Sequence, residues 1–244
     1  MSNSKKDRRA FVLLSGGIDS SVALRIAYAD FGGKVEAVSI NYGQRHMKEI
    51  EYAGRTCAQV GDIKHVVLDL PNCGGAMLTD LSIPIPDIKY DDIKGVSPTY
   101  VPFRNGLMLS ILAAHAQKWT NSRQADEPMM EAGIYFGAHA EDAANWAYPD
   151  CTPEFIGAMA NAIYIGTYQA VRLHTPLMWM RKASIVSLGA KLGVDFSNTW
   201  SCYAGKELHC GACPTCYARR EAFIIAGEDD PTEYEADKFE NLRK

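Results

Sequence analysis

The chain has 244 residues, 47% of them hydrophobic, and its 25 basic and 29 acidic residues leave a formal net charge of −4. This length fits one α/β domain with an appended module, and a small negative charge argues against a large surface for duplex nucleic acid. No apolar run approaches the length of a membrane span, and the polar segment Met1–Arg9 precedes no signal-peptide core. We expect a cytoplasmic protein with no membrane contact and no direct nucleic-acid partner.

Short β-rich runs alternate with helical patterns along the chain, which is typical of a parallel sheet covered by helices. Strands are predicted at Ala10–Leu14, Lys34–Ile40, His65–Leu68, Gly133–Gly137 and Val171–Thr175. Helices are predicted at Ser20–Ala29, Lys48–Val60, Asn105–Lys118, Glu154–Tyr164 and Lys182–Leu192. The predicted fold class is therefore α/β, an open parallel sheet with helices on both faces and a ligand crevice beyond the carboxyl ends of its strands.

The run Leu13–Ser21 turns from the first predicted strand through two glycines and several hydroxyl residues into a helix. Gly16 and Gly17 allow the backbone to approach a ligand closely, and the free N–H groups of a helix start attract an anion. In the alternative interpretation the turn is an ordinary one, and Asp19 or Ser20 only caps the helix. Because neither a Walker lysine nor a Gly-x-Gly-x-x-Gly pattern is present, a different kind of phosphate-binding loop is expected.

With the sequence Ser-Gly-Gly-Ile-Asp-Ser, this loop resembles the pyrophosphate loop of the ATP-pyrophosphatase group. Members of that group split ATP between the α- and β-phosphates and adenylate a substrate oxygen. The resemblance implies that ATP, with Mg²⁺, is bound by the loop and the first turns of the helix. The expected ATP-binding residues are Leu14, Ser15, Gly16, Gly17, Ile18, Asp19, Ser20, Ser21, Val22, Ala23 and Leu24.

A second motif is a group of cysteines near the C-terminus: Cys202, Cys210, Cys213 and Cys216. The last three stand three residues apart, so that a turn leading into a helix brings their sulfurs together, and a loop brings the fourth. Four thiolates favour a closed tetrahedral zinc site of structural role, while an iron–sulfur cluster is the main alternative. His209 could replace one cysteine, but four cysteines suffice, and we interpret it as a neighbour.

Two other segments have a distinctive composition. Residues from Pro71 to Pro102 are rich in Pro, Asp and Gly, which predicts a long loop over one rim of the site. The tail Gly227–Lys244 is acidic and polar and is predicted to be a solvated helix or a frayed end. We expect a pyrophosphate-loop domain at residues 1–195 and a four-cysteine zinc module with its tail at residues 196–244.

Several motifs occur in one order along the chain: Leu13–Ser21, Asn41–His46, Val101–Asn105, Tyr148–Cys151, Thr175–Trp179 and the cysteine group. Together, from about Phe11 to about Arg220, they resemble the 7-cyano-7-deazaguanine synthase family. The resemblance implies conversion of 7-carboxy-7-deazaguanine and ammonia to the nitrile by two adenylations, with two ATP cleaved to AMP and pyrophosphate. It also implies one structural zinc and a homodimer.

Three charged residues are candidates for catalysis. Asp19 could orient the metal or the loop, and Lys182 could neutralise the α-phosphate. Arg104 stands at a helix start, and both it and Arg45 are suited to a bidentate grip on carboxylate or phosphate. The catalytic set is therefore Asp19, Arg104 and Lys182.

The segment Gly137–Asp150 follows the fourth predicted strand and also opens on the crevice. Its carboxylates can accept hydrogen bonds from a guanine-like edge, and its aromatic rings can stack on the base. The expected substrate-binding residues are Tyr42, Gln44, Arg45, Phe103, Arg104, Glu141, Asp142, Trp146, Tyr148 and Asp150. His139 could serve as a general base for ammonia delivery, but a structural, hydrogen-bonded histidine is the preferred interpretation.

Two features depart from the commonest form of the family, which has Gly in place of Phe103 and a shorter sequence around residues 139–150. They leave open a related enzyme that conjugates a deazaguanine-type acid to another amine or to a protein. A tRNA-modifying pyrophosphatase is a further alternative, but neither a basic extension nor a catalytic cysteine pair is evident. A zinc-ribbon binding module is disfavoured by the intact pyrophosphate loop.

Overall fold

The computed structural model describes residues 7–45, 47–70, 77–80, 82–85, 87, 89, 92, 95–123 and 130–235. Within these ranges one parallel sheet has the strand order β3-β2-β1-β4-β5. Its strands are β1 (Asp7–Leu13), β2 (Val35–Asn41), β3 (Lys64–Asp69), β4 (Met130–Tyr135) and β5 (Val171–His174). All the predicted strands are confirmed, with ends that differ by up to three residues.

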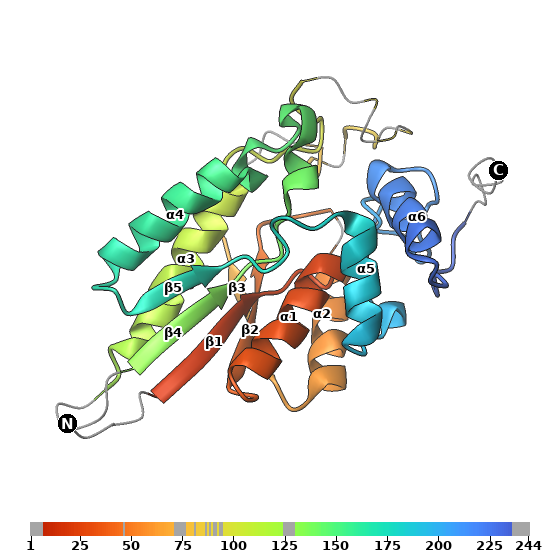
Figure 1. Cartoon of the computed structure of the whole chain (residues 1–244). Coiled ribbons are helices and arrows are strands. Elements are labelled where there is room, and N and C mark those ends of the chain that lie inside the picture. The colour runs from red at the N-terminus through yellow and green to blue at the C-terminus, as the bar shows by residue number, and fades with distance from the viewer. Residues whose placement is uncertain are drawn as a thin grey trace.

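Helices cover both faces of the sheet, α3 and α4 on one side and α1 and α2 on the other (Figure 1). The helices of the described residues are α1 (Ile18–Asp30), α2 (Lys48–Val60), α3 (Arg104–Thr120), α4 (Pro153–Gly166), α5 (Lys182–Lys191) and α6 (Pro214–Ala226). The first five correspond to the predicted helices, and α6 begins directly after Cys213 and contains Cys216, so the cysteine group leads into a helix as its spacing predicted. Pro214 at the first position and Gly227 in a left-handed C-cap set the limits of α6.

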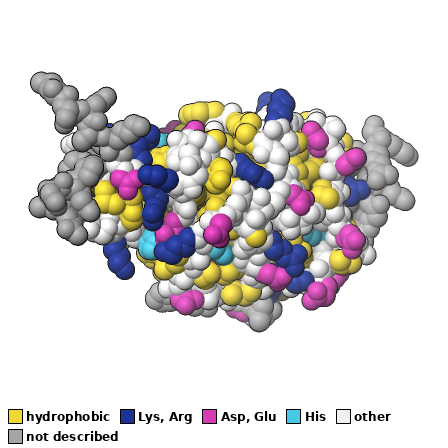
Figure 2. Space-filling view, turned by 90° about the horizontal axis from the view of Figure 1, so that it is seen from below, with side chains coloured by type: hydrophobic (Ala, Val, Ile, Leu, Met, Phe, Trp, Pro, Cys, Tyr) yellow, Lys and Arg dark blue, Asp and Glu magenta, His cyan; other side chains and the backbone are white. Residues whose placement is uncertain are grey.

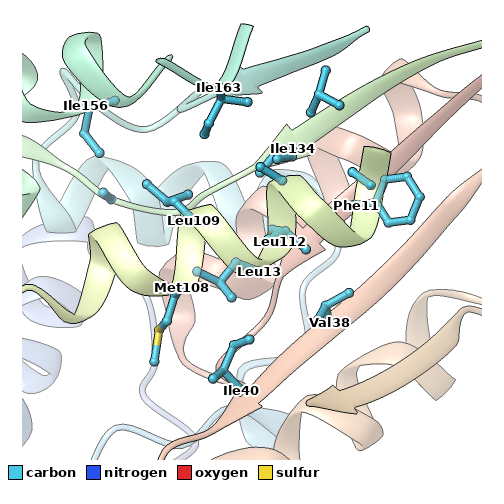
Figure 3. Close-up of a cluster of buried hydrophobic side chains, with 14 of the residues drawn as sticks. Phe11, Leu13, Val38, Ile40, Met108, Leu109, Leu112, Ile134, Ile156 and Ile163 are labelled. Atoms are coloured by element: carbon cyan, nitrogen blue, oxygen red, sulfur yellow. The ribbon is translucent and has the colours of Figure 1, made fainter. Parts of the chain in front are cut away.

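Side chains of β1 alternate between two apolar cores, as the period of a strand requires. Phe11 and Leu13 belong to the core formed with α3 and α4 (Figure 3), which includes Met108, Leu109, Leu112, Ile156 and Ile163. Ala10, Val12 and Leu14 belong to the opposite core, which includes Leu24, Ala27, Ala53 and Cys57. Because β1 is the central strand, burial on both faces fixes the position of the loop that follows it.

A third apolar cluster joins α1 to α5 and α6. Val22 of α1 and Ile185 of α5 pack in it with Phe196 and Phe223, whose rings meet edge to face at 5.0 Å between centroids. Phe223 lies on α6, so this cluster connects the C-terminal part of the chain to α1. The division between residues 195 and 196 stays a prediction.

The prediction for the tail is wrong where the structure describes it. Residues 227–235 form neither a helix nor a frayed end, because Tyr234 forms an isolated bridge with His209 and the Asp230 side chain is only 4% exposed. Asp230 instead pairs with Arg219 of α6 at 3.0 Å. Residues 236–244 lie outside the described residues.

The expected long loop is described at residues 77–80, 82–85, 87, 89, 92 and 95–102. Leu78 is buried in the core with α3, so the loop packs against the molecule. The other residues of this loop lie outside the described residues: 71–76, 81, 86, 88, 90, 91, 93 and 94. The same is true of residues 1–6 of the polar N-terminal segment and of residue 46, the last residue of the motif that begins at Asn41.

On the face shown in Figure 2, basic and acidic side chains are interspersed. None of the described helices combines the length and apolar character needed to cross a membrane.

Candidate functional site

A cavity of about 620 Å³ lies where the crevice was expected, at the carboxyl ends of β1, β2 and β4. The first residues of α1, α3 and α5 close its sides, and α6 forms a further wall. Many of the residues that we expected in the site line this cavity: Leu14, Ser15, Gly17, Ile18, Asp19, Ser20, Tyr42, Arg104, Glu141, Asp142 and Lys182.

Serine hydroxyl groups hold the loop between β1 and α1. Ser20 Oγ donates to the Gly17 carbonyl at 3.1 Å and lies 3.1 Å from Ser15 Oγ, while Ser21 Oγ donates to the same carbonyl at 2.8 Å. The N-cap of α1 is Gly17, and no side chain caps the helix, so the alternative in which Asp19 or Ser20 is the cap is wrong. The first-turn amides, which have no helical acceptor, remain available to an anion.

The two glycines of the loop have different roles. At Gly16, where φ is +77°, a Cβ would lie 2.3 Å from the Glu49 carbonyl oxygen of α2, so this glycine allows the loop to pack on another helix. Gly16 does not line the cavity, whereas Gly17 does. Several other members of the expected ATP-binding set point into the core instead of the cavity, because their turn of α1 faces β1 and α5: Ser21, Val22, Ala23 and Leu24.

A charged pair lies on the cavity wall, formed by Asp19 of α1 and Lys182 of α5. Lys182 Nζ donates to Asp19 Oδ2. Burial by itself would raise the pKa of Asp19, but the Lys182 ammonium group and the His139 ring outweigh it and lower this pKa. Asp19 therefore stays ionised, and its Oδ1 atom is buried without a hydrogen-bond partner in the described residues.

His139 lies beside this pair and is only 1% exposed. Its Nε2 atom is 3.8 Å from Asp19 Oδ1 and 3.5 Å from Asp142 Oδ2. Neither ring nitrogen has a hydrogen-bond partner among the described residues, so the interpretation of His139 as a hydrogen-bonded structural histidine is wrong. Glu141 Oε2, in contrast, accepts a hydrogen bond of 2.7 Å from the Lys182 backbone at the start of α5.

Arg104 lines the cavity from the start of α3, which packs on the face of the sheet opposite to α1. Its guanidinium donates to Tyr42 Oη at 2.9 Å. Burial raises the pKa of Tyr42 to about 12, so the phenol remains neutral. Gln44 does not reach the cavity. It accepts from the Tyr42 backbone at 2.9 Å and donates to Glu49 at 3.0 Å, so it orders the turn after β2.

Arg45 and Phe103, both expected to contact substrate, lie away from the cavity. The Arg45 guanidinium donates to the carbonyls of Asp80 and Ile83, each at 2.9 Å, and so holds the long loop in place. Phe103 is 58% exposed in a left-handed conformation, with its ring edge to face on Phe155 at 5.7 Å. Phe103 therefore forms no part of the wall of this cavity.

Three further candidates in the segment after β4 are also outside the cavity lining. Trp146 is 71% exposed, and Tyr148 is buried with its hydroxyl accepting from Ser97 at 3.2 Å. Asp150 Oδ2 accepts from the Asn105 backbone at 3.0 Å in the first turn of α3, and burial raises the pKa of this carboxyl. The contacts of Tyr148 and Asp150 organise the segments on either side of the start of α3.

Other polar side chains on the cavity wall were not assigned a role from the sequence: Ser39, Glu49, Asn105, Ser201, Tyr203, Thr215 and Arg219. Ser39 lies near the carboxyl end of β2, where strand position alone could have indicated it. Thr215 lies between two of the cysteines and Arg219 follows them, but the motif does not indicate a cavity position for either, because α6 reaches the cavity through tertiary packing.

The four cysteine Sγ atoms lie within 4.8 Å of one another: Cys202, Cys210, Cys213 and Cys216. The backbone amides of Ala204 and Cys210 each donate to Cys202 Sγ at 3.3 Å. Four thiolates around Zn²⁺ stand about 3.8 Å apart, which follows from a Zn–S distance of about 2.3 Å, so the cluster fits one tetrahedral ion. His209 is a neighbour, as expected, because its Nε2 accepts from the Ser201 backbone at 3.1 Å.

These features define an open parallel α/β protein with a glycine–serine loop at the carboxyl edge of its sheet and a four-cysteine metal site beside it. Residues 9–227 match the family model described as "Queuosine biosynthesis protein QueC". The chain belongs to this family, which confirms the prediction made from its motifs.

Relatives match over nearly the whole chain. It is 41% identical over 234 residues to a 7-cyano-7-deazaguanine synthase of Thermoplasma acidophilum, covering 93% of this chain and 92% of the relative. It is 39% identical to the protein of the same name from a Marinomonas species, covering 93% and 99%. Among solved structures, NMN synthetase from Francisella tularensis is similar with a TM-score of 0.48 and 16% identity, covering 93% of this chain and 80% of that one.

Proposed function

We propose that this protein converts 7-carboxy-7-deazaguanine and ammonia to 7-cyano-7-deazaguanine, with two ATP cleaved to AMP and pyrophosphate. The observation that carries the proposal is the convergence of Ser15, Asp19, Lys182 and Arg104 on one cavity at the carboxyl edge of the sheet. The names of the relatives, at about 40% identity over most of the chain, support the substrate.

A carboxylate is a poor acceptor for ammonia, so it must first become an acyl adenylate with AMP as the leaving group. The first-turn amides of α1 and the Ser15 hydroxyl would bind the phosphates, where preorganised donors stabilise developing charge. Lys182 would neutralise the α-phosphate, and Arg104 would hold the substrate carboxylate. The amide formed from ammonia would be adenylated in the same place and lose AMP to give the nitrile.

Mg²⁺ bound with ATP would offset the charge of the phosphates. Asp19 is suited to hold it, because Mg²⁺ prefers carboxylate oxygens and Asp19 Oδ1 is buried without a partner in the described residues. The four cysteines would bind one zinc of structural role, since a site closed by four protein ligands leaves no position for substrate. We also propose a cytoplasmic homodimer that uses free ammonia.

The test is incubation of the purified protein with 7-carboxy-7-deazaguanine, ATP, Mg²⁺ and ammonium, followed by mass spectrometry and nucleotide analysis. We expect two AMP per nitrile, and conversion of supplied amide to nitrile with ATP. Ser15→Ala should lower the rate about 10²-fold, the usual cost of one preorganised donor to a charged intermediate. Ser122→Ala is the matched control, since the Ser122 hydroxyl donates to the Trp119 carbonyl at the end of α3 and does not line the cavity.

Formation of ADP would contradict the assignment of the loop. Accumulation of amide without nitrile, or a mass increase on a protein, would favour the conjugating enzyme over the synthase.

A further inference from the structure

The outer face of α4 is exposed and almost free of charge. The helix lies beside β5 at the edge of the sheet (Figure 1), with Ile156 and Ile163 on the side that packs into the core. The opposite side presents six exposed residues at the spacing of one helical stripe: Glu154, Gly157, Ala158, Asn161, Ala162 and Ile165. Glu154 is the only charged residue of α4, whereas the outer face of a surface helix is normally polar.

Two exposed aromatic side chains extend this stripe at its ends. The Phe103 ring lies on Phe155 at the start of α4, and Tyr168, which is 89% exposed, follows two residues after the last residue of the helix. Full cover of the stripe and the two rings would remove roughly 600–800 Å² from water, close to the share of one protein in a standard specific interface. Apolar patches of this size on a monomer mark interaction sites.

The six residues of the stripe are arranged symmetrically about a point between residues 159 and 160. When the helix is read in reverse, Gly157 takes the place of Ala162, and Ala158 takes the place of Asn161. A second α4 laid antiparallel on the first would therefore meet glycine or alanine at each contact near the centre, and small side chains allow two helices to approach closely. Such self-complementarity is what a two-fold interface between identical chains requires.

The charges at the ends of α4 favour the antiparallel arrangement. It places Glu154 of one copy beside Tyr164 of the other, where the half-exposed Arg172 lies over the ring at 4.5 Å and pairs with Glu131 at 3.7 Å. A parallel arrangement would instead bring the two Glu154 carboxylates together. Antiparallel helix dipoles also attract each other. Because α4 has no basic residue, it lacks the charge that binds a helix to an anionic membrane surface.

We infer that the outer face of α4 binds the same face of a second copy of this chain, antiparallel about a two-fold axis near residues 159 and 160. The inference names the surface through which the proposed homodimer forms, and it rests on that part of the proposed function alone. No residue of α4 lines the cavity, so both copies would keep an accessible site.

The experiment is sedimentation equilibrium of the full chain over a series of protein concentrations. It compares wild type with Ala158→Arg and with the control Ala29→Arg, which adds the same charge at an exposed alanine of α1. Circular dichroism reports the fold of each variant, and pyrophosphate–ATP exchange that depends on 7-carboxy-7-deazaguanine reports adenylation. For Ala158→Arg we expect a native fold and a dimer dissociation constant raised about 10²-fold or more, because two like charges would meet in a closed interface. The control should associate as wild type does.

Exchange of charge tests the orientation of the two copies. Glu154→Arg and Arg172→Glu, made singly, should each raise the dissociation constant about tenfold, because each puts like charges at both ends of the interface. The double variant should recover to within about threefold of wild type. The two residues lie at opposite ends of α4 within one chain, so recovery reports a contact between copies.

A dimer that Ala158→Arg leaves intact, or a double variant that fails to recover, would overturn the inference while the homodimer stands. A wild type that stays monomeric at every concentration, whether or not it cosediments with anionic lipid vesicles, would overturn both. Absence of exchange in wild type would reject the proposed reaction, whereas the sedimentation results alone decide the inference.

Discussion

At the scale of single residues, Arg219 is the largest of the fully buried side chains in the described part of the molecule. Its guanidinium donates to Asp230 at 3.0 Å, to Thr199 at 2.8 Å and to the Phe196 carbonyl at 3.1 Å. The planar fork of arginine suits several acceptors at once. One side chain thereby connects α6, the segment before the cysteines and the tail.

Asp230→Asn should therefore be strongly destabilising. It removes the charge that balances a guanidinium with a side chain only 1% exposed, and such a loss costs about 3–5 kcal/mol. Urea unfolding monitored by circular dichroism measures the change. Asp229→Asn, an exposed neighbour, is the control and should change the free energy of unfolding by less than about 0.5 kcal/mol.

The same pair has a pH dependence of known sign. Burial would raise the pKa of Asp230, but the Arg219 charge outweighs burial and lowers it from the ordinary value of 3.8. A carboxylate with a lowered folded-state pKa contributes stability that is complete above its unfolded pKa and is lost as pH falls through the folded one. The difference between wild type and Asp230→Asn should thus shrink below a pH of about 3.8. A difference that grows in acid would contradict this.

At the scale of elements, two glycines bring backbone segments into contact at the cavity. Gly16 packs the loop after β1 on α2, and Gly137 packs the chain after β4 on the start of α1. Neither contact depends on apolar area, so no hydrophobic pattern marks them. The position of the chain that carries His139 relative to Asp19 follows from the contact at Gly137.

Gly137→Ala should push β4 and α1 apart, because the added methyl group would meet backbone atoms of Asp19 at 2.9 and 3.0 Å. We expect a loss of about 1–3 kcal/mol in stability from overpacking, with a fall in adenylation. Gly157→Ala in α4 is the matched control, since no atom lies within 4 Å of its added Cβ. That variant should gain about 0.5–1 kcal/mol from helix propensity. Equal effects of the two variants on unfolding and on exchange would contradict the role of Gly137.

The elements were predictable because their signals are local, whereas many site contacts were not. Alternation and helical period located every described strand and the first five helices. The end of the first strand also indicated Asp19, since parallel strands present their carboxyl ends at one edge, whereas Arg104 was indicated by its place at a helix start. Arg45 and Tyr148, which we expected to contact substrate, bond in this structure to two loop carbonyls and to Ser97, and these partners are chosen by tertiary packing. A motif gives residue type and order but not the group that each side chain meets.

At the scale of the whole molecule, the four-cysteine cluster and the cavity share one wall. Trp200 and Ser201 line the cavity and precede Cys202 directly, and Trp200 packs in the cluster that contains three of the cysteines. The backbone amide of Trp200 donates to the Gly16 carbonyl at 2.8 Å. Trp200 therefore links the four-cysteine cluster to the loop between β1 and α1.

We expect the purified protein to contain about one zinc per chain, the occupancy of a four-thiolate site. Cys213→Ser should lower metal content and melting temperature before it lowers the rate of the folded fraction, because metal binding is coupled to folding. Cys57→Ala is the control, a buried thiol on α2 outside the cluster, and should keep full metal content. Iron in metal analysis, with visible charge-transfer absorption, would favour a cluster instead.

The central place of β1 in the sheet also determines when the molecule can assemble during synthesis. β1 pairs on one side with β2, the next strand made, but on the other with β4, whose first residue Met130 pairs with Asp7. Contacts between such distant parts of a chain make folding slow. The edge of β1 that pairs with β4 thus stays without its partner while α1 to α3 emerge from the ribosome. An unpaired strand edge is a template for aggregation. The nascent chain is consequently most vulnerable before β4 is made, so rapid synthesis through residues 104–135 would favour a correctly folded product.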